Sequence, residues 1–282
     1  MGKRIFNFIN TMLSFVLLSM KCRFKGFMNK LEIFRVLNSL YFKSKINSSS
    51  DKEVNQRIFN FNITGLSYRS LYFLFNEIFV YSDYYFESPK QCPAIIDCGA
   101  NIGMTILFFK KLYPNCSIIA FEPNPFLFAL LTKNVNQNKL ENVVLENVGL
   151  SNEEGSSDFF FDGFKASFGG SIKKDRGGTN VLKIQTRKLS EYIKGGSFDL
   201  IKIDIEGAET DVLIDLCESN TLRNAENYII EYHMASKNNN TYFSDFLKPF
   251  ENQKYTYLLK ANNKKGVIIH DILISLSKSN VV

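Results

Sequence analysis

The stretch IIDCGANIG, residues 95–103, decides how this chain folds. An apolar run ends at an acid and a cysteine, and two glycines then enclose the turn into the next segment. Gly99 lets the backbone approach a ligand closely, and the N-terminus of a following helix presents unpaired N–H groups. Asn101 and Met104 stand where the G-x-G-x-x-G pattern of dinucleotide enzymes has glycines. The spacing therefore argues against a nicotinamide-dependent oxidoreductase.

Short apolar runs alternate with helical segments on both sides of this turn. The expected strands are 94–98, 117–122, 142–148, 198–204 and 227–233, and the expected helices are about 103–113, 125–139 and 208–216. Strands that are apolar on both faces and alternate with helices predict an α/β fold with a mostly parallel sheet and helices on both faces. Residues 255–260 and 271–277 suit an antiparallel pair that closes one edge. Residues 152–197 hold two weaker strands and the glycine-rich stretches 168–172 and 176–179, and predict a loop or hairpin insertion near the ligand.

An acid ends the second expected strand, in the motif AFEPNP at residues 120–125. Glu122 lies about 23 residues after Gly99, where a carboxylate can accept two hydrogen bonds from a ribose diol. Pro125 suits the first position of the next helix. We expect Glu122 to bind a ribose.

A second group of acids follows the fourth strand, in KIDIEGAE at residues 202–209. Asp204 and Glu206 stand at the carboxyl edge of the sheet, where α/β folds bind ligands, whereas Glu209 in the first helical turn is expected to be structural. Alternation on the fifth strand puts Glu231 and His233 on the same face. His233 is the candidate general base, with Asp204 or Glu206 as an alternative or as its orienting partner. Such ligands can hold a divalent metal, but nothing in the spacing requires one, and we assign none.

Together these motifs resemble the FkbM-type methyltransferases that depend on S-adenosylmethionine. The resemblance covers roughly residues 75–260, and IIDCGANIG with IKIDIEGAE is its specific combination. It implies a Rossmann-like methyltransferase fold, S-adenosylmethionine as cofactor, and O-methylation of a small molecule or of a glycan or glycolipid hydroxyl. The cofactor residues that it implies are Asp97, Gly99, Ala100, Asn101 and Gly103 at the methionine end, Glu122 at the ribose, and Asn147 and Val148 beside the adenine.

The resemblance has one departure, because residues 188–191 read KLSE where the family often has a Leu-Asp-Asp type sequence. That difference bears on the packing of the insertion more than on the cofactor site. The competing hypothesis is a non-catalytic, cofactor-binding protein with a methyltransferase fold. Such a protein would lose the acids and the histidine at the sheet edge, and this chain retains them.

The charge of the chain is unevenly distributed. Of 282 residues, 45% are hydrophobic and 22% charged, which excludes collagen-like, low-complexity and disordered proteins. The net charge of +6 is concentrated in residues 1–50, which hold about nine basic side chains and one acid, Glu32. A nucleic-acid-binding domain would carry a basic patch on its folded body, so we expect no nucleic-acid partner. We divide the chain into a basic, helical N-terminal arm with a polar linker at 44–56 (1–56) and a methyltransferase domain (57–282, core about 94–277).

The first twenty residues predict a helix with a stripe of uncharged polar side chains, Asn7, Asn10, Thr11 and Ser14. Apolar side chains cover much of the rest: Phe6, Phe8, Ile9, Leu13, Phe15 and Val16. This helix is expected to dock on the protein's own body or a second subunit, or to make a peripheral membrane contact through residues 1–30. No apolar run reaches the roughly 18 residues of a bilayer span. Five scattered cysteines indicate reduced thiols and a cytoplasmic location.

Overall fold

The computed structural model describes residues 2–46, 53–161, 170–174, 178–234, 242–261 and 271–279, with the side chains of residues 2–8 left aside. The stretches 168–169 and 176–177 and the side chains of Phe6, Asn7 and Phe8 thus lie outside the described part. The chain forms two compact units. The first comprises residues 1–85, 102–111 and 130–140, and the second comprises residues 86–101, 112–129 and 141–282. Residues 57–85, which the sequence assigns to the methyltransferase domain, cluster with the first unit.

The first unit begins with two long helices, α1 (Gly2–Lys21) and α2 (Phe27–Ile46). A hairpin of β1 (Val54–Ile58) and β2 (Phe61–Gly65) follows, and then α3 (Tyr68–Phe75), which continues into the π-helical turn η1 (Asn76–Val80). The linker expected at 44–56 is wrong at both ends, because α2 runs to residue 46 and β1 starts at residue 54. Alternate residues of β1 are buried, and this packing overrides the polar composition of the stretch.

Aromatic side chains fill the core of the first unit. The ring of Phe79 stacks on those of Phe75 and Phe24, with ring centroids 5.3 and 5.8 Å apart. It also forms a T-shaped pair with Phe108, with centroids 5.4 Å apart. Helix α1 packs within this unit through Phe15, which is 4% exposed. The rings of Phe15 and Tyr41 form a T-shaped pair with centroids 5.3 Å apart. The expectation that the helix docks on the protein's own body is therefore confirmed for this face of α1.

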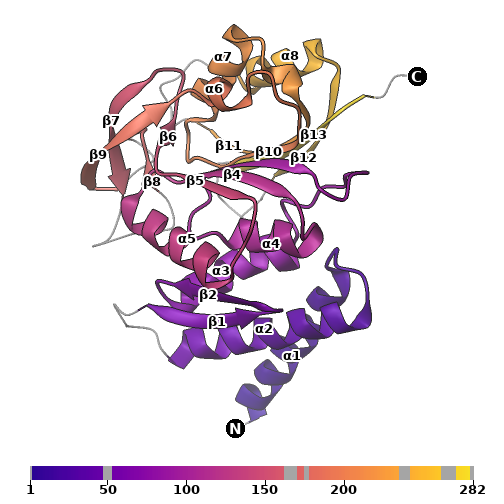
Figure 1. The fold of residues 1–282 in the computed structure, drawn as a ribbon. Helices are drawn as coiled ribbons and strands as arrows, with labels where there is room; N and C mark the ends of the chain where they lie inside the picture. Colours follow the sequence, from indigo (N-terminus) through magenta and orange to yellow (C-terminus); the bar gives the residue numbers. More distant parts are fainter. Residues whose placement is uncertain are drawn as a thin grey trace. The chain divides into compact units, whose positions relative to one another are not determined.

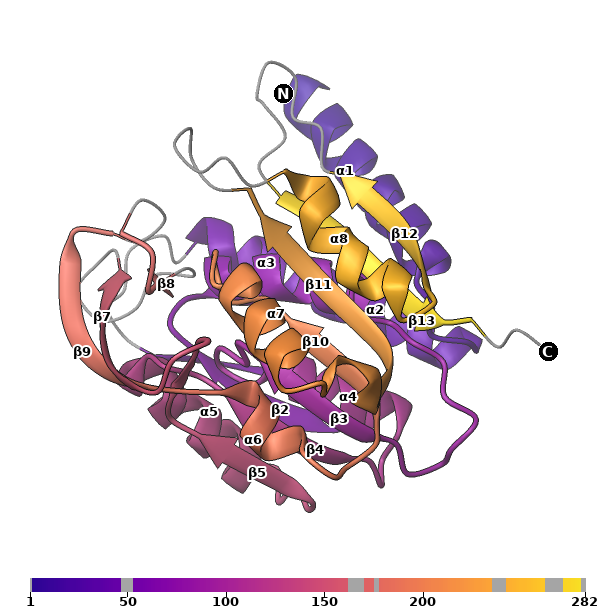
Figure 2. The same ribbon diagram turned by 90° about the horizontal axis from the view of Figure 1, so that it is seen from above.

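A seven-stranded sheet forms the second unit (Figure 1), and its strands follow the order β12-β13-β11-β10-β3-β4-β5 (Figure 2). Its strands are β3 (Ala94–Cys98), β4 (Ser117–Phe121), β5 (Val143–Glu146), β10 (Phe198–Ile203), β11 (Ala225–His233), β12 (Tyr255–Ala261) and β13 (Asp271–Lys278). The first five pair in parallel, and β12 and β13 close the edge in antiparallel pairing. The predicted α/β class, with a mostly parallel sheet and an antiparallel closing strand, is confirmed. The expected helices at 103–113 and 125–139 are α4 (Met104–Leu112) and α5 (Pro125–Gln137).

Three helices of the second unit pack on one face of its sheet (Figure 2). They are α6 (Leu189–Ile193), α7 (Glu209–Glu218) and α8 (Phe243–Asn252). Side chains of α7 and α8 such as Leu216 and Phe250 share one buried cluster with Ile201 and Tyr228 of the strands. Helix α8 is not predicted from the sequence, because Pro249 lies inside it and proline normally indicates a helix boundary. Among the described residues no helix has the length and apolar character needed to cross a membrane.

The expected insertion is a small sheet with strands in the order β6-β9-β7-β8. Its strands are β6 (Gly149–Leu150), β7 (Gly155–Phe161), β8 (Gly170–Ser171) and β9 (Asn180–Arg187), with Phe159, Phe161 and Ile184 as its core. The two weaker strands predicted within 152–197 are thus confirmed as β7 and β9. Ser171 Oγ donates a hydrogen bond to the Glu206 carbonyl, and Lys173 pairs with Asp211 at 2.7 Å. These two contacts bring the insertion to the start of α7.

Candidate active site

The strand order of the large sheet reverses between β3 and β10, which pair in parallel. Ligands of open α/β sheets bind outside the carboxyl ends of the strands at such a point. The turn after β3 lies here: the N–H groups of Gly99 and Ala100 donate to the Phe121 carbonyl at 3.0 and 2.9 Å. Gly99 has φ +85°, and a Cβ on it would lie 1.9 Å from the Asp204 carbonyl oxygen. Only glycine therefore fits this turn.

A buried lysine, Lys202 on β10, stabilises the turn that follows β3. Its side chain is 1% exposed, and Nζ lies 3.2 Å from Oδ1 of Asp97, which is fully buried. Nζ also donates to the Gly99 carbonyl at 2.8 Å and lies 3.7 Å from Asp204 Oδ2. Burial alone would lower the pKa of Lys202, but the charges of Asp97 and Asp204 raise it above its ordinary value. Asp97 thus faces Lys202. Nothing local in the sequence marks this lysine as part of the site, because it is one polar residue in an apolar strand.

Glu122 follows β4 and is 5% exposed. Its two carboxylate oxygens accept backbone N–H groups, Oε2 from Asn101 at 2.9 Å and Oε1 from Asn124 at 2.8 Å. Burial raises the pKa of Glu122 to about 7, although these two N–H groups act in the opposite direction. A carboxylate has about four acceptor sites, so two hydroxyl groups can still donate to Glu122.

The remaining residues that the resemblance assigns to the cofactor have different environments. Asn147 is exposed, and its Nδ2 donates to the Glu122 carbonyl at 2.7 Å and to the Pro123 carbonyl at 3.2 Å. Val148 packs against the core of the second unit. Gly103, with φ +87°, belongs to the first unit, where a Cβ would lie 2.8 Å from Leu131 Cδ1 of α5. Gly103 thus allows close helix packing, while Asn147 holds the turn after Glu122.

His233, the last residue of β11, is held by a buried carboxylate. Its Nδ1 lies 2.9 Å from Oε1 of Glu209, which is 1% exposed. The same oxygen accepts the N–H groups of Ile205 and Gly207 at 3.3 and 3.0 Å. An oxygen that accepts two backbone N–H groups carries no proton of its own, so the proton between Oε1 and Nδ1 belongs to Nδ1. Glu209, which the sequence indicates as a structural acid, thus also orients the histidine.

The other ring nitrogen of His233 faces three carboxylates. Nε2 lies 3.5 Å from Glu206 Oε2 and 4.0 Å from the nearest oxygens of Asp204 and Glu231. Burial alone would lower the pKa of His233, but Glu209, Asp204 and Glu206 raise it to about 10. The structure thus brings together His233, Asp204 and Glu206 as the sequence predicts. Their ligand atoms lie within 4.8 Å of one another, so these three residues could hold a divalent cation.

Glu206 has a left-handed backbone, with φ 55°. Such a conformation costs about 1–3 kcal/mol in a non-glycine residue and persists only where the surroundings impose it. Ser171 provides one such restraint by donating to the Glu206 carbonyl. The strain therefore fixes where the Glu206 side chain leaves the backbone, beside His233.

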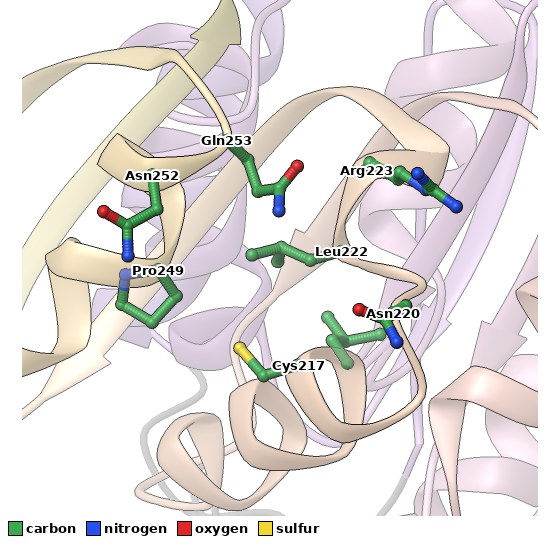
Figure 3. A pocket seen from close by; sticks show the side chains of 8 residues that line it. Cys217, Asn220, Leu222, Arg223, Pro249, Asn252 and Gln253 are labelled. Atoms are coloured by element: carbon green, nitrogen blue, oxygen red, sulfur yellow. The ribbon is translucent and has the colours of Figure 1, made fainter.

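A pocket of about 310 Å³ lies elsewhere in the second unit (Figure 3). Its lining includes Cys217 of α7, Arg223 and Gln253, together with Leu222, which precedes the start of β11. It therefore lies where β11 begins, at the edge of the sheet opposite His233. Ligands of α/β sheets bind at the carboxyl edge, so this pocket is separate from the candidate active site.

The sequence matches the family described as the Methyltransferase FkbM domain over residues 97–257. It is 30% identical to Methyltransferase sdnD of Sordaria araneosa, with 50% of this chain and 67% of that protein covered. It is 28% identical to the 2-O-methyltransferase NoeI of Sinorhizobium fredii, with 44% and 57% covered. It is also 28% identical to the hexuronic acid methyltransferase AglP of Haloferax volcanii, with 52% and 59% covered. The chain thus spans 57–67% of the length of these relatives.

The sheet and the site at its switch point define the second unit as a methyltransferase domain of the Rossmann-like class. Because the family match extends over more than half of the chain, the chain belongs to the FkbM-type methyltransferases. The cofactor of this class is S-adenosylmethionine, and the described residues fit it. Glu122 keeps two acceptor positions for a ribose diol, and Gly99 lets the turn after β3 lie directly against the Asp204 carbonyl, at the edge of the sheet where ligands of this fold bind.

Proposed function

We propose that this protein transfers the methyl group of S-adenosylmethionine to a hydroxyl oxygen of a small molecule or of a glycan or glycolipid. The observation that carries the proposal is the buried His233–Glu209 pair, which faces Asp204 and Glu206 beside the glycine turn. Two relatives, named as a 2-O-methyltransferase and a hexuronic acid methyltransferase, support an oxygen acceptor on a sugar. The excess of basic residues lies in the N-terminal arm, so we propose no nucleic-acid acceptor.

The cofactor site consists of residues with separate tasks. Glu122 binds the ribose, and Asn147 and Val148 border the adenine. Gly99, Ala100 and Asn101 form the wall at the methionine end. Asp97 acts indirectly, through Lys202. Gly103 ends the turn. Two charge-assisted hydrogen bonds from the ribose to Glu122 contribute roughly 1.5–3 kcal/mol each, so removing the Glu122 carboxylate weakens cofactor binding strongly.

The acceptor lies at the carboxylates around His233. S-adenosylmethionine would supply the methyl group and leave as S-adenosylhomocysteine, and the acceptor hydroxyl would lose its proton. Glu206 accepts this proton, because its side chain is 32% exposed and can reach a ligand, whereas Asp204 faces Lys202. His233 remains an imidazolium near neutral pH and orients both Glu206 and the acceptor oxygen. Alignment of nucleophile, methyl group and sulfur can lower such a barrier by about 7–11 kcal/mol.

The roles of His233 and Glu206 differ in their dependence on pH. If Glu206 accepts the proton, methyl transfer at saturating cofactor is constant from neutral pH upward and falls as His233 loses its charge near pH 10. If His233 were the base, transfer would rise toward that pH instead. The charged groups near His233 include Glu209 of α7, Asp204 and Glu206 after β10, and Glu231 of β11, and Asp271 on β13 is its register partner.

The direct test uses S-adenosylmethionine labelled in the methyl group. We expect label in a hydroxyl-bearing acceptor from a panel of sugars, glycolipids and small alcohols. His233→Asn should abolish transfer while cofactor affinity measured by calorimetry stays the same, and Val144→Ala, at an exposed position on β5, is the control. Cofactor binding without transfer to any acceptor would favour the non-catalytic binding protein.

The location and the division of the chain belong to the same proposal. All five cysteines are free, which suits the reducing cytoplasm. We assign catalysis to residues 57–282, with the sheet core at about 94–277, and contact with a partner surface to the N-terminal arm. Expression of residues 53–282, a cut that keeps β1 whole, tests whether the arm takes part in the site, because the fragment should still bind the cofactor if it does not.

A further inference from the structure

Helix α1 has two apolar faces. One packs within the first unit through Phe15 and Ser19, which are 4% and 3% exposed. The other carries large apolar side chains that are 43–62% exposed: Ile9, Leu13, Val16, Leu17 and Met20. The spacing i, i+4, i+7, i+8 and i+11 puts these five side chains on one helix face. Packing on the protein's own body therefore leaves a second apolar surface on α1.

This surface continues onto the start of α2. Lys30 Nζ donates to the Met20 carbonyl at 2.7 Å, so the first turn of α2 lies beside the last turn of α1. Phe27 and Met28 are each 73% exposed, and Leu31 is 46% exposed. Exposed apolar side chains that occur singly are ordinary, but a contiguous group on two adjacent helices marks an interaction surface.

The segment that carries the surface has charges of one sign. Residues 1–31 contain no acid and six basic residues, Lys3, Arg4, Lys21, Arg23, Lys25 and Lys30. The first acid, Glu32, forms two hydrogen bonds with the Arg35 guanidinium. An apolar surface on a segment whose own charges are all positive is complementary to an apolar phase covered with anions.

We infer that α1 and the first turn of α2, residues 9–31, form a docking surface for an anionic lipid bilayer. The exposed apolar face enters the boundary between headgroups and acyl chains, and Lys21, Arg23 and Lys25 contact the headgroups. A second copy of the chain would place cations opposite cations, which is unfavourable. A nucleic acid would leave the apolar side chains uncovered.

The basic residues of this surface lie at the end of α1 and after it, and not on the polar face of the helix. A typical interfacial helix carries its Lys and Arg on the polar face, whereas the polar residues of α1 include the uncharged Asn10 and Ser14. Here the basic groups come from the end of α1 and the connection to α2, residues 21–25. This inference is independent of methyl transfer, because the docking surface can be measured without cofactor or acceptor.

The test is sedimentation of the full chain with vesicles. We expect binding to vesicles of 70% phosphatidylcholine and 30% phosphatidylglycerol, and little binding to pure phosphatidylcholine. Lys21→Gln with Lys25→Gln should weaken binding by about five-fold per lysine, which corresponds to about 1 kcal/mol each. Leu17→Ser with Phe27→Ser should abolish it, whereas Leu258→Ser should not, although Leu258 is 78% exposed on β12.

Circular dichroism and cofactor binding establish that each variant folds, which is expected because the exchanged side chains are exposed. Equal binding to neutral and anionic vesicles, or no binding at all by the full chain, overturns the inference. A dimer in light scattering that the Leu17→Ser, Phe27→Ser variant loses would assign the surface to a second copy and also overturn it.

Discussion

The exchange of Lys202 for methionine tests how the glycine turn is held. Methionine has a similar length, so the packing is retained, but Asp97 keeps a buried charge without its counter-ion. Removing one partner of a buried ion pair costs about 3–5 kcal/mol. The Gly99 carbonyl also loses its 2.8 Å donor, so cofactor affinity should fall as well. We therefore expect Lys202→Met to lower the free energy of unfolding by about 3–5 kcal/mol.

Urea unfolding at equilibrium measures this change, provided the slope of the transition is unaltered. The control is Lys183→Met, since Lys183 pairs with Asp158 at the surface, where the two side chains are 71% and 47% exposed. That exchange should cost less than about 1 kcal/mol. Adding Asp97→Asn to Lys202→Met should restore part of the loss. If both methionine variants lose the same small free energy of unfolding, or if Asp97→Asn restores none of it, the buried pair does not stabilise the turn.

The remaining predictions concern cofactor binding, pH and metal. Because Glu122 has a pKa of about 7, cofactor affinity should rise about ten-fold from pH 6 to pH 8 in calorimetry, and a flat profile in wild type would contradict its role. Glu122→Gln should remove that rise. Gly99→Ala should abolish cofactor binding, since its Cβ would overlap the Asp204 carbonyl. The raised pKa of His233 contributes stability that is full below about pH 6.5 and lost as pH rises through 10, and His233→Asn should flatten this loss in thermal melts. Chelation by EDTA should leave transfer unchanged; activity lost and then restored by Mg²⁺ would place a cation at Asp204, Glu206 and His233.

Local patterns in the sequence determined the fold class and the order of its elements. The strands β3, β4 and β10 appear as apolar runs that end at an acid or a turn, and these signals lie within a few residues. The glycine turn and Glu122 were recognisable for the same reason, because the turn requires Gly99 and the acid ends its own strand. The antiparallel pair β12 and β13 also follows from two apolar runs without a helical pattern.

Tertiary structure alone decided the electrostatic partners and the exposed face of the arm. Lys202 and Asp97 are 105 residues apart in the chain and meet because β10 pairs beside β3. Glu209 looks like an ordinary helix-start acid until β11 brings His233 to 2.9 Å from it. Helix α1 is apolar on most of its circumference, so its periodicity could not tell which face the first unit covers. Burial and charge pairing depend on residues that are distant in sequence, and for that reason they emerge only when the chain is folded.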